Sequence, residues 1–319
     1  MGSGGIARRL QFLVVLAGLM TVEKAKGVEQ HKPIVNPHPF TFHLNNEKLC
    51  DVDSDVLIWI HSAPNHFRDR QIIRETWGNP GNFHLHKAAL VFFLGISTSP
   101  PVQQMIEYES EVYNDIVQST FIDHYHNLTY KAISGSRWMS LYCNRINLVL
   151  KADDDMMVDV YLLFNHIHSL QQNGRLRTNT ILCDVWMNRW PDRNPGKWRV
   201  SNEEYAANYY PTYCPGLGLV MTGDLPPRLF AASLYEKYFW IDDVYFTGLL
   251  ARTVNATFER LGAGVHFGSA RKIKMQMLAE NPYQWVFYHV HERPSMLTIW
   301  ETIEARQKDR LETGASSFT

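Results

Sequence analysis

The sequence lacks the signatures of several common protein classes. Its 31 basic and 32 acidic side chains give a net charge of −1, so there is no electrostatic basis for nucleic-acid binding. No G-x-G-x-x-G follows the first apolar strand, which in practice excludes a dinucleotide-dependent oxidoreductase. No internal repeat or low-complexity tract is present. What remains is a globular chain of 319 residues, 45% of them apolar and 13% aromatic.

Cysteine is scarce, and the absence of any C-x-x-C pair argues against a structural zinc site. The four cysteines are Cys50, Cys143, Cys183 and Cys214. An even number suits two disulfides in an oxidising compartment, and the sequence allows three pairings. Two N-glycosylation sequons, at Asn127 and Asn255, agree with that compartment.

The chain also lacks an apolar run of full transmembrane length. The run over residues 10–22 is short for a bilayer span and typical of a signal h-region. Two arginines precede it and no good cleavage site follows, so we expect a cytoplasmic tip and signal-anchor over residues 1–22. The proline-containing residues 23–49 predict an extended stem, and residues 50–319 predict the folded domain in the secretory lumen.

Strands and helices alternate along the folded part. Continuous apolar runs predict buried strands, and apolar residues at helical spacing predict amphipathic helices. The expected strands cover 56–60, 88–94, 116–117, 146–152, 181–185, 218–222 and 285–291, and the expected helices cover 67–77, 102–113, 129–143, 160–170 and 295–311. This order implies an α/β fold with a mostly parallel twisted sheet and helices on both faces.

The most informative motif is the triplet Asp153-Asp154-Asp155, directly after the apolar run 146–152. Adjacent carboxylates repel one another, and ligands of α/β sheets usually bind at the carboxyl ends of strands. A hard divalent cation that keeps open positions for substrate phosphates would gather such carboxylates. The alternative is an acidic turn, with Asp159 opening the next helix as an N-cap.

Further segments carry motifs that belong together. Residues 70–78 match R-x-x-I-R-x-T-W-G, and residues 210–218 match Y-P-P-Y-C-x-G-x-G with one substitution. Residues 242–248 are similar to E-D-V-Y-x-T-G. With the aspartate triplet, these segments resemble the inverting β-1,3-glycosyltransferases, a family that includes β-1,3-galactosyltransferases and β-1,3-N-acetylglucosaminyltransferases. The matches run in family order, and the resemblance implies a GT-A-type nucleotide-sugar-binding fold.

The resemblance implies a metal-dependent enzyme that transfers a hexose from a UDP-sugar in β-1,3 linkage to a glycoprotein or glycolipid glycan, with inversion. Galactose is favoured because the block around Cys214 looks like the galactosyl branch; N-acetylglucosamine and N-acetylgalactosamine are the alternatives. A single-pass type II Golgi membrane protein with a lumenal catalytic domain is implied as well. A catalytically silent glycan-binding relative is the competing hypothesis from another class.

Metal binding is assigned by the same resemblance, with Mn²⁺ or Mg²⁺ as cofactor. A cation that bridges the pyrophosphate stabilises UDP as the leaving group. Asp155 is the expected carboxylate ligand, while Asp153 and Asp154 hold the ribose or orient the site. A late-strand histidine is the second ligand; the candidates, in order of preference, are His291, His289 and His266. The first matches the Val-His step before the final helix. The remaining histidines, His66 among them, are read as ordinary surface or core residues.

An inverting displacement needs one base to take the proton of the acceptor hydroxyl, with a pKa raised by burial. Asp243 fits this role, because the surrounding aromatics of residues 239–245 exclude water. Asp242 is placed with the substrate. The alternative reading makes both aspartates ordinary residues at a helix N-terminus.

Arg70 and Arg74 lie one helical turn apart, on one face. We expect them near the uracil or diphosphate, because a planar guanidinium binds oxyanions through two hydrogen bonds. The alternative is surface ion pairing with Glu75 or Asp69. Ser62, at the end of the first strand, is expected to meet the nucleotide through its hydroxyl or backbone.

Overall fold

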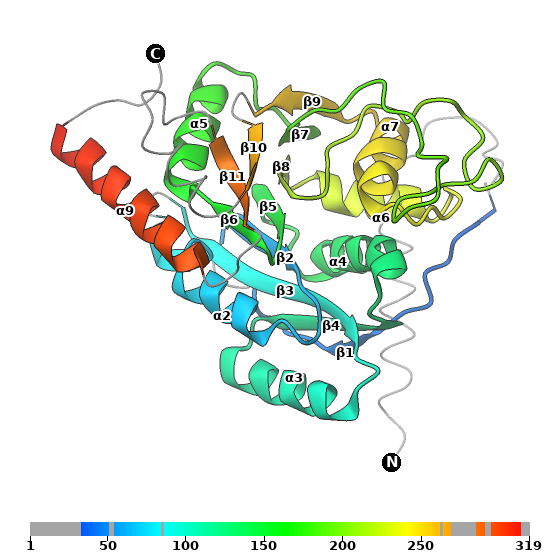
Figure 1. Cartoon of the computed structure of the whole chain (residues 1–319), viewed down its shortest axis with the longest axis horizontal. Coiled ribbons are helices and arrows are strands. Elements are labelled where there is room, and N and C mark those ends of the chain that lie inside the picture. The colour runs from blue at the N-terminus through cyan, green and yellow to red at the C-terminus, as the bar shows by residue number, and fades with distance from the viewer. Residues whose placement is uncertain are drawn as a thin grey trace. The chain divides into compact units, whose positions relative to one another are not determined.

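The computed structural model describes residues 33–50, 54–83, 86–261, 264–268, 285–290 and 295–313 (Figure 1). The described residues from Val35 onward form one compact unit. The expected anchor over residues 1–22 lies outside the described residues. Within the ranges given above, no helix is long and apolar enough to cross a membrane.

The elements follow the predicted alternation. The strands are β1 (Phe42–Leu44), β2 (Val56–His61), β3 (Ala88–Ile96), β4 (Ile116–Ile122), β5 (Leu148–Asp153), β6 (Met156–Val158), β7 (Thr180–Cys183), β8 (Gly218–Thr222), β9 (Thr257–Arg260), β10 (Gly264–Gly268) and β11 (Trp285–Val290). The helices are α2 (Phe67–Glu75), α3 (Pro100–Tyr113), α4 (Leu128–Tyr142), α5 (Val160–Gln172), α6 (Leu225–Ser233), α7 (Ala251–Thr253) and α9 (Met296–Thr313), with the 3₁₀ turns η1 (Pro80–Asn82) and η2 (Tyr125–Asn127) and the π-helix η3 (Val244–Leu250). Every expected strand and helix is present, and most of them begin or end a few residues away from the expected positions.

The main sheet has the strand order β1-β4-β3-β2-β5-β8-β7-β9. Strands β4, β3, β2 and β5 are parallel neighbours, whereas β8 runs antiparallel to both β5 and β7, and β1 antiparallel to β4. The parallel strands β2 and β5 are buried along nearly their whole length, as expected where helices cover both faces. This order confirms the predicted α/β class with a mostly parallel sheet.

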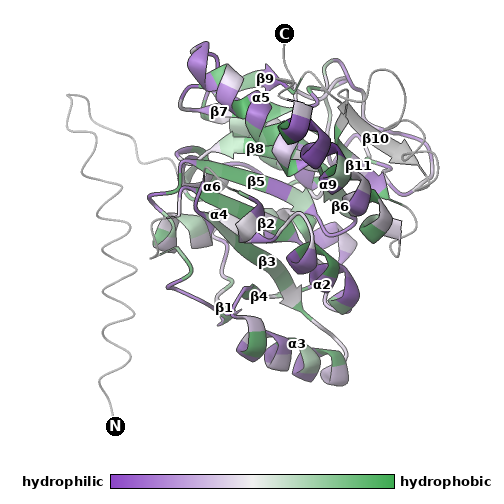
Figure 2. Ribbon diagram, turned by 90° about the vertical axis from the view of Figure 1, so that its left-hand side faces the viewer, coloured by the Kyte–Doolittle hydropathy of each residue, from purple (hydrophilic) through white to green (hydrophobic). Residues whose placement is uncertain are grey.

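Two cores lie on opposite faces of the main sheet, because successive side chains of a strand point to opposite sides. On β2, Val56, Ile58 and Ile60 join the core that contains α2, α5 and α9. Leu57 and Trp59 join the other core, with α4, α6 and η3. Figure 2 shows apolar colouring concentrated on the central strands between these helices.

The folded unit begins earlier than expected. Strand β1 falls inside the predicted stem, residues 23–49, and pairs with β4. The backbone N–H groups of Val35 and Asn36 donate to the Leu234 carbonyl oxygen at 2.9 and 3.1 Å. The boundary at residue 50 was therefore placed too late. A strand of three residues is too short for its apolar alternation to be recognised next to prolines.

Both expected disulfides form, and the structure gives their pairing. Cys50 is joined to Cys143 and Cys183 to Cys214. The second bridge links the end of β7 to the segment just before β8. It therefore closes the base of the connection between these strands, residues 184–217, which we call the β7–β8 loop.

A second, three-stranded sheet has the order β10-β11-β6. β6 follows the aspartate triplet directly and pairs antiparallel with β11, with Met156 opposite His289. This pairing brings the late strand beside the triplet, although 134 residues of sequence separate Asp155 from His289.

Candidate active site

The aspartate triplet lies where the chain leaves β5 at the carboxyl edge of the parallel strands. Asp153 is paired with His61, the last residue of β2. The Asp154 N–H donates to the His61 carbonyl oxygen at 3.1 Å, and the chain then turns into β6. This edge is the usual ligand-binding edge of an α/β sheet. Asp153 thus ends β5, and Asp154 and Asp155 form the turn to β6. Asp159 separately caps α5 by accepting from the Leu162 N–H.

Asp154 points into the segment between β2 and α2. Its Oδ2 accepts from the Ala63 N–H at 3.1 Å and lies 2.8 Å from His66 Nδ1. Burial alone would raise the pKa of Asp154, but hydrogen bonds from His66, Ser62 and Ala63 outweigh it and hold that pKa below its usual value. Asp154 is therefore an ionised anchor for this segment. His66, which sequence reasoning treated as ordinary, is one of its partners.

Asp155 faces β11. Its Oδ2 lies 3.0 Å from His289 Nε2, and the Val290 N–H donates to its carbonyl oxygen at 3.3 Å. The other carboxylate oxygen, Oδ1, is buried and has no hydrogen-bond partner among the described residues. Such an orphaned oxygen beside an imidazole fits a divalent cation that takes oxygen and nitrogen ligands. His291, the preferred candidate from the sequence, lies outside the described residues.

Asp153 lies nearest to Lys151, whose Nζ is 3.7 Å from its Oδ1. Burial raises the pKa of Asp153 to about 8; the carboxylates of Asp155, Asp242 and Asp154 act in the same direction, and Lys151 opposes them. Its side chain still has 38% of its surface exposed. Asp153 is thus reachable, and its carboxyl oxygens can bind sugar hydroxyls.

Asp242 and Asp243 directly precede the π-helix η3, and Asp243 is its N-cap. Asp243 Oδ1 accepts from the Val244 N–H at 2.8 Å. Burial raises the pKa of Asp243 to about 7, and the neighbouring charge of Asp242 adds to this; burial also raises the pKa of Asp242. π-helical turns occur often at functional sites. Here the turn is held in place by Thr247 Oγ1, which donates to the Asp243 carbonyl oxygen at 2.7 Å.

Lys151 and Gly216 join these aspartates to the triplet. Lys151 Nζ donates to the Gly216 carbonyl oxygen at 3.3 Å while it faces Asp153. A Cβ on Gly216 would lie 3.7 Å from Asp243 Cβ and 3.9 Å from Asp242 Oδ2. The five aspartates of the two segments therefore share one site. The sequence signal for this role is a lysine inside an apolar strand.

Arg70 and Arg74 are turned inward. Arg70 is fully buried; it donates to both oxygens of Glu109 and to Ser62 Oγ at 3.0 Å. Its remaining N–H groups reach the carbonyl oxygens of Ala63 and Pro64. The donors of Arg70 are thus engaged within the protein, which favours a positioning role for Arg70 over direct contact with the nucleotide. The Ser62 hydroxyl is engaged by the same guanidinium.

Arg74 completes this network. Its guanidinium donates to Asp115 Oδ2 and Oδ1 at 2.7 and 2.8 Å, and to Glu109 Oε1 at 2.7 Å. Neither of the alternative partners from the sequence, Glu75 and Asp69, takes this role. The true partners lie on α3 and just after it, and helical spacing within α2 gave no information about them.

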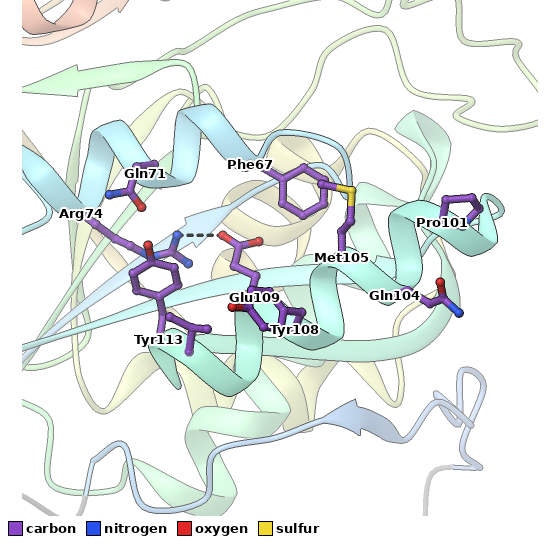
Figure 3. A pocket seen from close by; sticks show the side chains of 10 residues that line it. Phe67, Gln71, Arg74, Pro101, Gln104, Met105, Tyr108, Glu109 and Tyr113 are labelled. Carbon is purple, nitrogen blue, oxygen red and sulfur yellow. Dashed lines mark hydrogen bonds and ion pairs between the residues drawn. The ribbon is translucent and has the colours of Figure 1, made fainter.

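A cavity of about 690 Å³ lies between α2 and α3 (Figure 3). Apolar side chains such as Phe67 and Met105 line it, and the dashed line in the figure marks the ion pair between Arg74 and Glu109. None of the site aspartates lines this cavity. It is therefore separate from the candidate active site.

Comparison with known proteins first defines the class. The family model described as Galactosyltransferase matches residues 68–261, more than half of the chain. The chain is 34% identical over 220 residues to Beta-1,3-galactosyltransferase 1 of Mus musculus and of Homo sapiens, with 68% of this chain and 66% of the relative covered. To Beta-1,3-galactosyltransferase 2 of Homo sapiens it is 33% identical over 221 residues, with 68% and 52% covered.

The chain belongs to the galactosyltransferase family. Its match spans slightly less than two thirds of the length of the first of these relatives and about half of the second. Among solved structures it is similar to the galactosyltransferase LgtC in complex with donor and acceptor sugar analogs, with 9% identity and a TM-score of 0.39 over 78% of this chain and 95% of that one. The WbbM bifunctional glycosyltransferase gives 12% identity and a TM-score of 0.38, with 82% and 50% covered. At these scores neither structure informs the chemistry of this chain.

Proposed function

We propose that this protein transfers a hexose, galactose by preference, from a UDP-sugar to a hydroxyl group of a glycan acceptor, forming a β-1,3 linkage with inversion. The observation that carries the proposal is the placement of Asp243, whose pKa is raised to about 7, in one site with the triplet at the end of β5. Membership of the galactosyltransferase family supports the reaction class. The names of the relatives supply galactose and the β-1,3 linkage.

Asp155 and His289 fit a divalent cation, Mn²⁺ or Mg²⁺. We now prefer His289 to His291 as the second ligand, because its Nε2 is 3.0 Å from Asp155 Oδ2. When bound, such a cation neutralises charge that develops on the pyrophosphate of the leaving UDP. Asp154 is engaged with Ala63 and His66, so we assign it to holding the shape of the site and not to binding metal.

Asp243 is the general base of the proposed reaction. As the acceptor oxygen bonds to the anomeric carbon, its proton passes to the Asp243 carboxylate, and the bond from that carbon to the UDP oxygen breaks. Asp243 accepts backbone hydrogen bonds from Val244, at Oδ1, and from Gly216, and these bonds hold the carboxylate while leaving lone pairs for the proton. A base with a pKa near the working pH is both ionised often enough and basic enough for this task.

The other site residues either bind the substrates or hold the site in shape. Asp153 and Asp242 hold hydroxyl groups of the sugars or ribose. Ser62 and Arg70 act as positioning residues, because the Arg70 guanidinium ties together the carbonyl oxygens of Ala63 and Pro64 in the segment that also holds Asp154. A displaced segment would move the triplet, so these residues affect catalysis without touching substrate.

We infer that the catalytic domain lies in the lumen of the Golgi, tethered by an N-terminal anchor. Two disulfides support an oxidising compartment. The sequon at Asn255, which lies in an exposed turn, supports the same placement.

The test is transfer of radiolabelled sugar from UDP-galactose, UDP-N-acetylglucosamine and UDP-N-acetylgalactosamine to methyl β-glycosides, with Mn²⁺ or with a chelator. We expect galactose transfer that the chelator abolishes. Asp155→Ala should abolish transfer and weaken UDP binding only when Mn²⁺ is present, whereas Asp309→Ala, on the exposed side of α9, should behave as wild type. Binding of a UDP-sugar without any transfer would instead favour the catalytically silent relative.

A further inference from the structure

Three aromatic side chains from separate segments meet next to the start of η3. They are Tyr125 in η2, Trp198 in the β7–β8 loop and Trp240, two residues before Asp242; we call them the aromatic wall. The Trp198 indole Nε1–H donates to the Tyr125 hydroxyl at 2.7 Å. The rings of Tyr125 and Trp240 lie edge to face, with centroids 6.5 Å apart. The wall is therefore a defined arrangement and not a chance group of surface residues.

The wall borders the catalytic carboxylates. Burial raises the pKa of Tyr125, and the charges of Asp242, Asp243 and Asp153 raise it further. Trp240 stands two residues before Asp242, and its ring contacts that of Tyr125. The wall therefore lies beside the segment that carries the proposed base.

Packing does not account for the exposure of these rings. Trp198 has 55% of its surface exposed and Tyr125 has 37%. Both are nevertheless held: the Lys197 ammonium lies 4.1 Å from the centroid of the Tyr125 ring and 5.4 Å from that of Trp198. The third ring of the wall is held as well, because His126 stacks on Trp240 with centroids 4.3 Å apart. Large aromatics that are exposed and yet fixed are typical of surfaces that bind a ligand.

Covalent and hydrogen bonds fix the β7–β8 loop, which carries Trp198. Its base is closed by the disulfide between Cys183 and Cys214. Inside it, Arg193 donates to the carbonyl oxygens of Val200, Ser201 and Tyr205 at 2.8 to 2.9 Å. A long loop that is fixed by internal bonds pays its ordering cost before a ligand arrives, which favours binding.

We propose that the aromatic wall is the acceptor subsite and that it stacks on the apolar C–H face of the terminal pyranose of the glycan. This inference rests on the proposed function, because it places that sugar's hydroxyl at Asp243. The Tyr125 oxygen already accepts from Trp198, and no described residue accepts the Tyr125 hydroxyl hydrogen. That hydrogen can therefore be donated to an oxygen of the sugar. With the acceptor sugar on the wall, the aspartate triplet at the end of β5 can bind the UDP-sugar donor.

Kinetic variants give the first test, with methyl β-N-acetylglucosaminide and methyl β-galactoside as probes. Trp198→Ala should raise the acceptor KM about tenfold, the size of one lost stacking contact, and leave the donor KM and UDP binding unchanged. Trp198→Phe should recover most of the loss, because it keeps a ring. Trp190→Ala is the matched control: it removes a tryptophan of the same loop that is 73% exposed and has no ring contact with the wall within the described part of the chain.

Binding without donor gives the second test and separates this inference from the proposed function. Saturation-transfer NMR of the same glycosides should show binding in the wild type and in Trp190→Ala, and about tenfold weaker binding in Trp198→Ala. If the wild type binds in this way but transfers no sugar, the acceptor subsite stands and the proposed reaction fails. If neither glycoside binds the wild type, or if Trp198→Ala keeps wild-type affinity and acceptor KM, the wall is not the acceptor subsite.

Discussion

Two neighbouring aspartates, Asp242 and Asp243, have raised pKa values, and only one is needed as a base. Asp243 also caps η3 through the Val244 N–H, which fixes the direction of its carboxylate. Asparagine has the same shape and caps a helix equally well. The substitution Asp243→Asn therefore removes the proton acceptor and little else.

We predict that Asp243→Asn lowers turnover by about 10²- to 10⁴-fold, the usual contribution of a general base. Binding of UDP-sugar and Mn²⁺, measured by calorimetry, should stay at wild-type levels. Asp242→Asn is the matched control and should be milder. A dead Asp242→Asn together with a nearly normal Asp243→Asn would exchange the two roles, and full activity in both would place the base elsewhere.

The pH profile tests the same residue. Asp243 must be ionised to accept a proton, and its pKa is raised to about 7 in the folded protein. We therefore expect kcat/KM to fall about tenfold per unit as the pH drops below 7, and to level off above 7 to 8. Measurements between pH 5 and 9 decide this. An acid limb with its midpoint near 4, the ordinary value for aspartate, would show that the titrating group is not a buried carboxyl of this kind.

The contribution of Asp243 to folding stability depends on pH in the opposite direction to that of an ion-paired aspartate. The folded state raises the pKa of Asp243 above the unfolded value, so it binds the proton more tightly than the unfolded chain does. The stability that this group contributes is present below about pH 4 and is lost as the pH rises towards 7. Asp243→Asn should therefore be at least as stable as the wild type at neutral pH, which a denaturation curve can check.

At the residue scale, the sequence was informative where motif and chemistry coincide. The triplet and Asp243 were identified because carboxylates beside apolar strands or aromatics are unusual. The contacts that these residues make with their partners were harder to predict from the sequence. The contact between Asp155 and His289 depends on β6 pairing with β11, and that of Asp154 with His66 depends on the turn after β2. Such pairings arise from tertiary packing and leave no local pattern.

At the element scale, the contact between α2 and α3 depends on a buried ion-pair network. Arg70 is fully buried and Glu109 is 7% exposed, and Glu109 bonds both Arg70 and Arg74. Removing one partner of a buried pair leaves an uncompensated charge. The network matters beyond these helices, because Arg70 also holds the segment that reaches Asp154.

We predict that Glu109→Gln lowers the free energy of unfolding by about 3–5 kcal/mol, the usual cost of breaking a buried ion pair. Urea denaturation at neutral pH measures it. Glu312→Gln breaks the exposed pair with Lys308 on α9 and should cost less than about 1 kcal/mol. Equal, small losses in both variants would mean that water reaches the guanidinium groups and that the network does not hold α2 against α3.

Elements with a continuous apolar run or a clear helical period were predictable from the sequence, whereas β1, β6 and α6 were not. β2, β3 and β5 are continuous apolar runs and were placed within one or two residues of the predicted positions. β1 and β6 have three residues each, and their pairing partners are far away in the sequence. A helix after Asp243 was given only by the alternative reading of Asp242 and Asp243 as residues at a helix N-terminus. The structure has a π-helix there, and its π-helical turn follows from packing around Thr247 and not from its composition.

At the scale of the whole molecule, the chain forms one α/β unit from Val35 with a site on the carboxyl edge of its parallel strands. The proposed location of this unit in the secretory lumen would make the exposed turn at Asn255 accessible to glycosylation. We predict an N-glycan there. Asn255→Gln should remove one endoglycosidase-sensitive step in electrophoretic mobility of protein made in a secretory host. An Asn255→Gln variant with unchanged mobility would contradict this modification, and Asn127→Gln reports separately on the second sequon.

The most direct test of the central claim is the structure of the product. The purified protein is incubated with UDP-galactose, Mn²⁺ and methyl β-N-acetylglucosaminide, and the new glycosidic bond is examined by NMR. We expect galactose at the acceptor's O3 with a β anomeric configuration, the inverse of the α configuration in the donor. An α-linked product, a different linkage position or release of free galactose only would contradict the account.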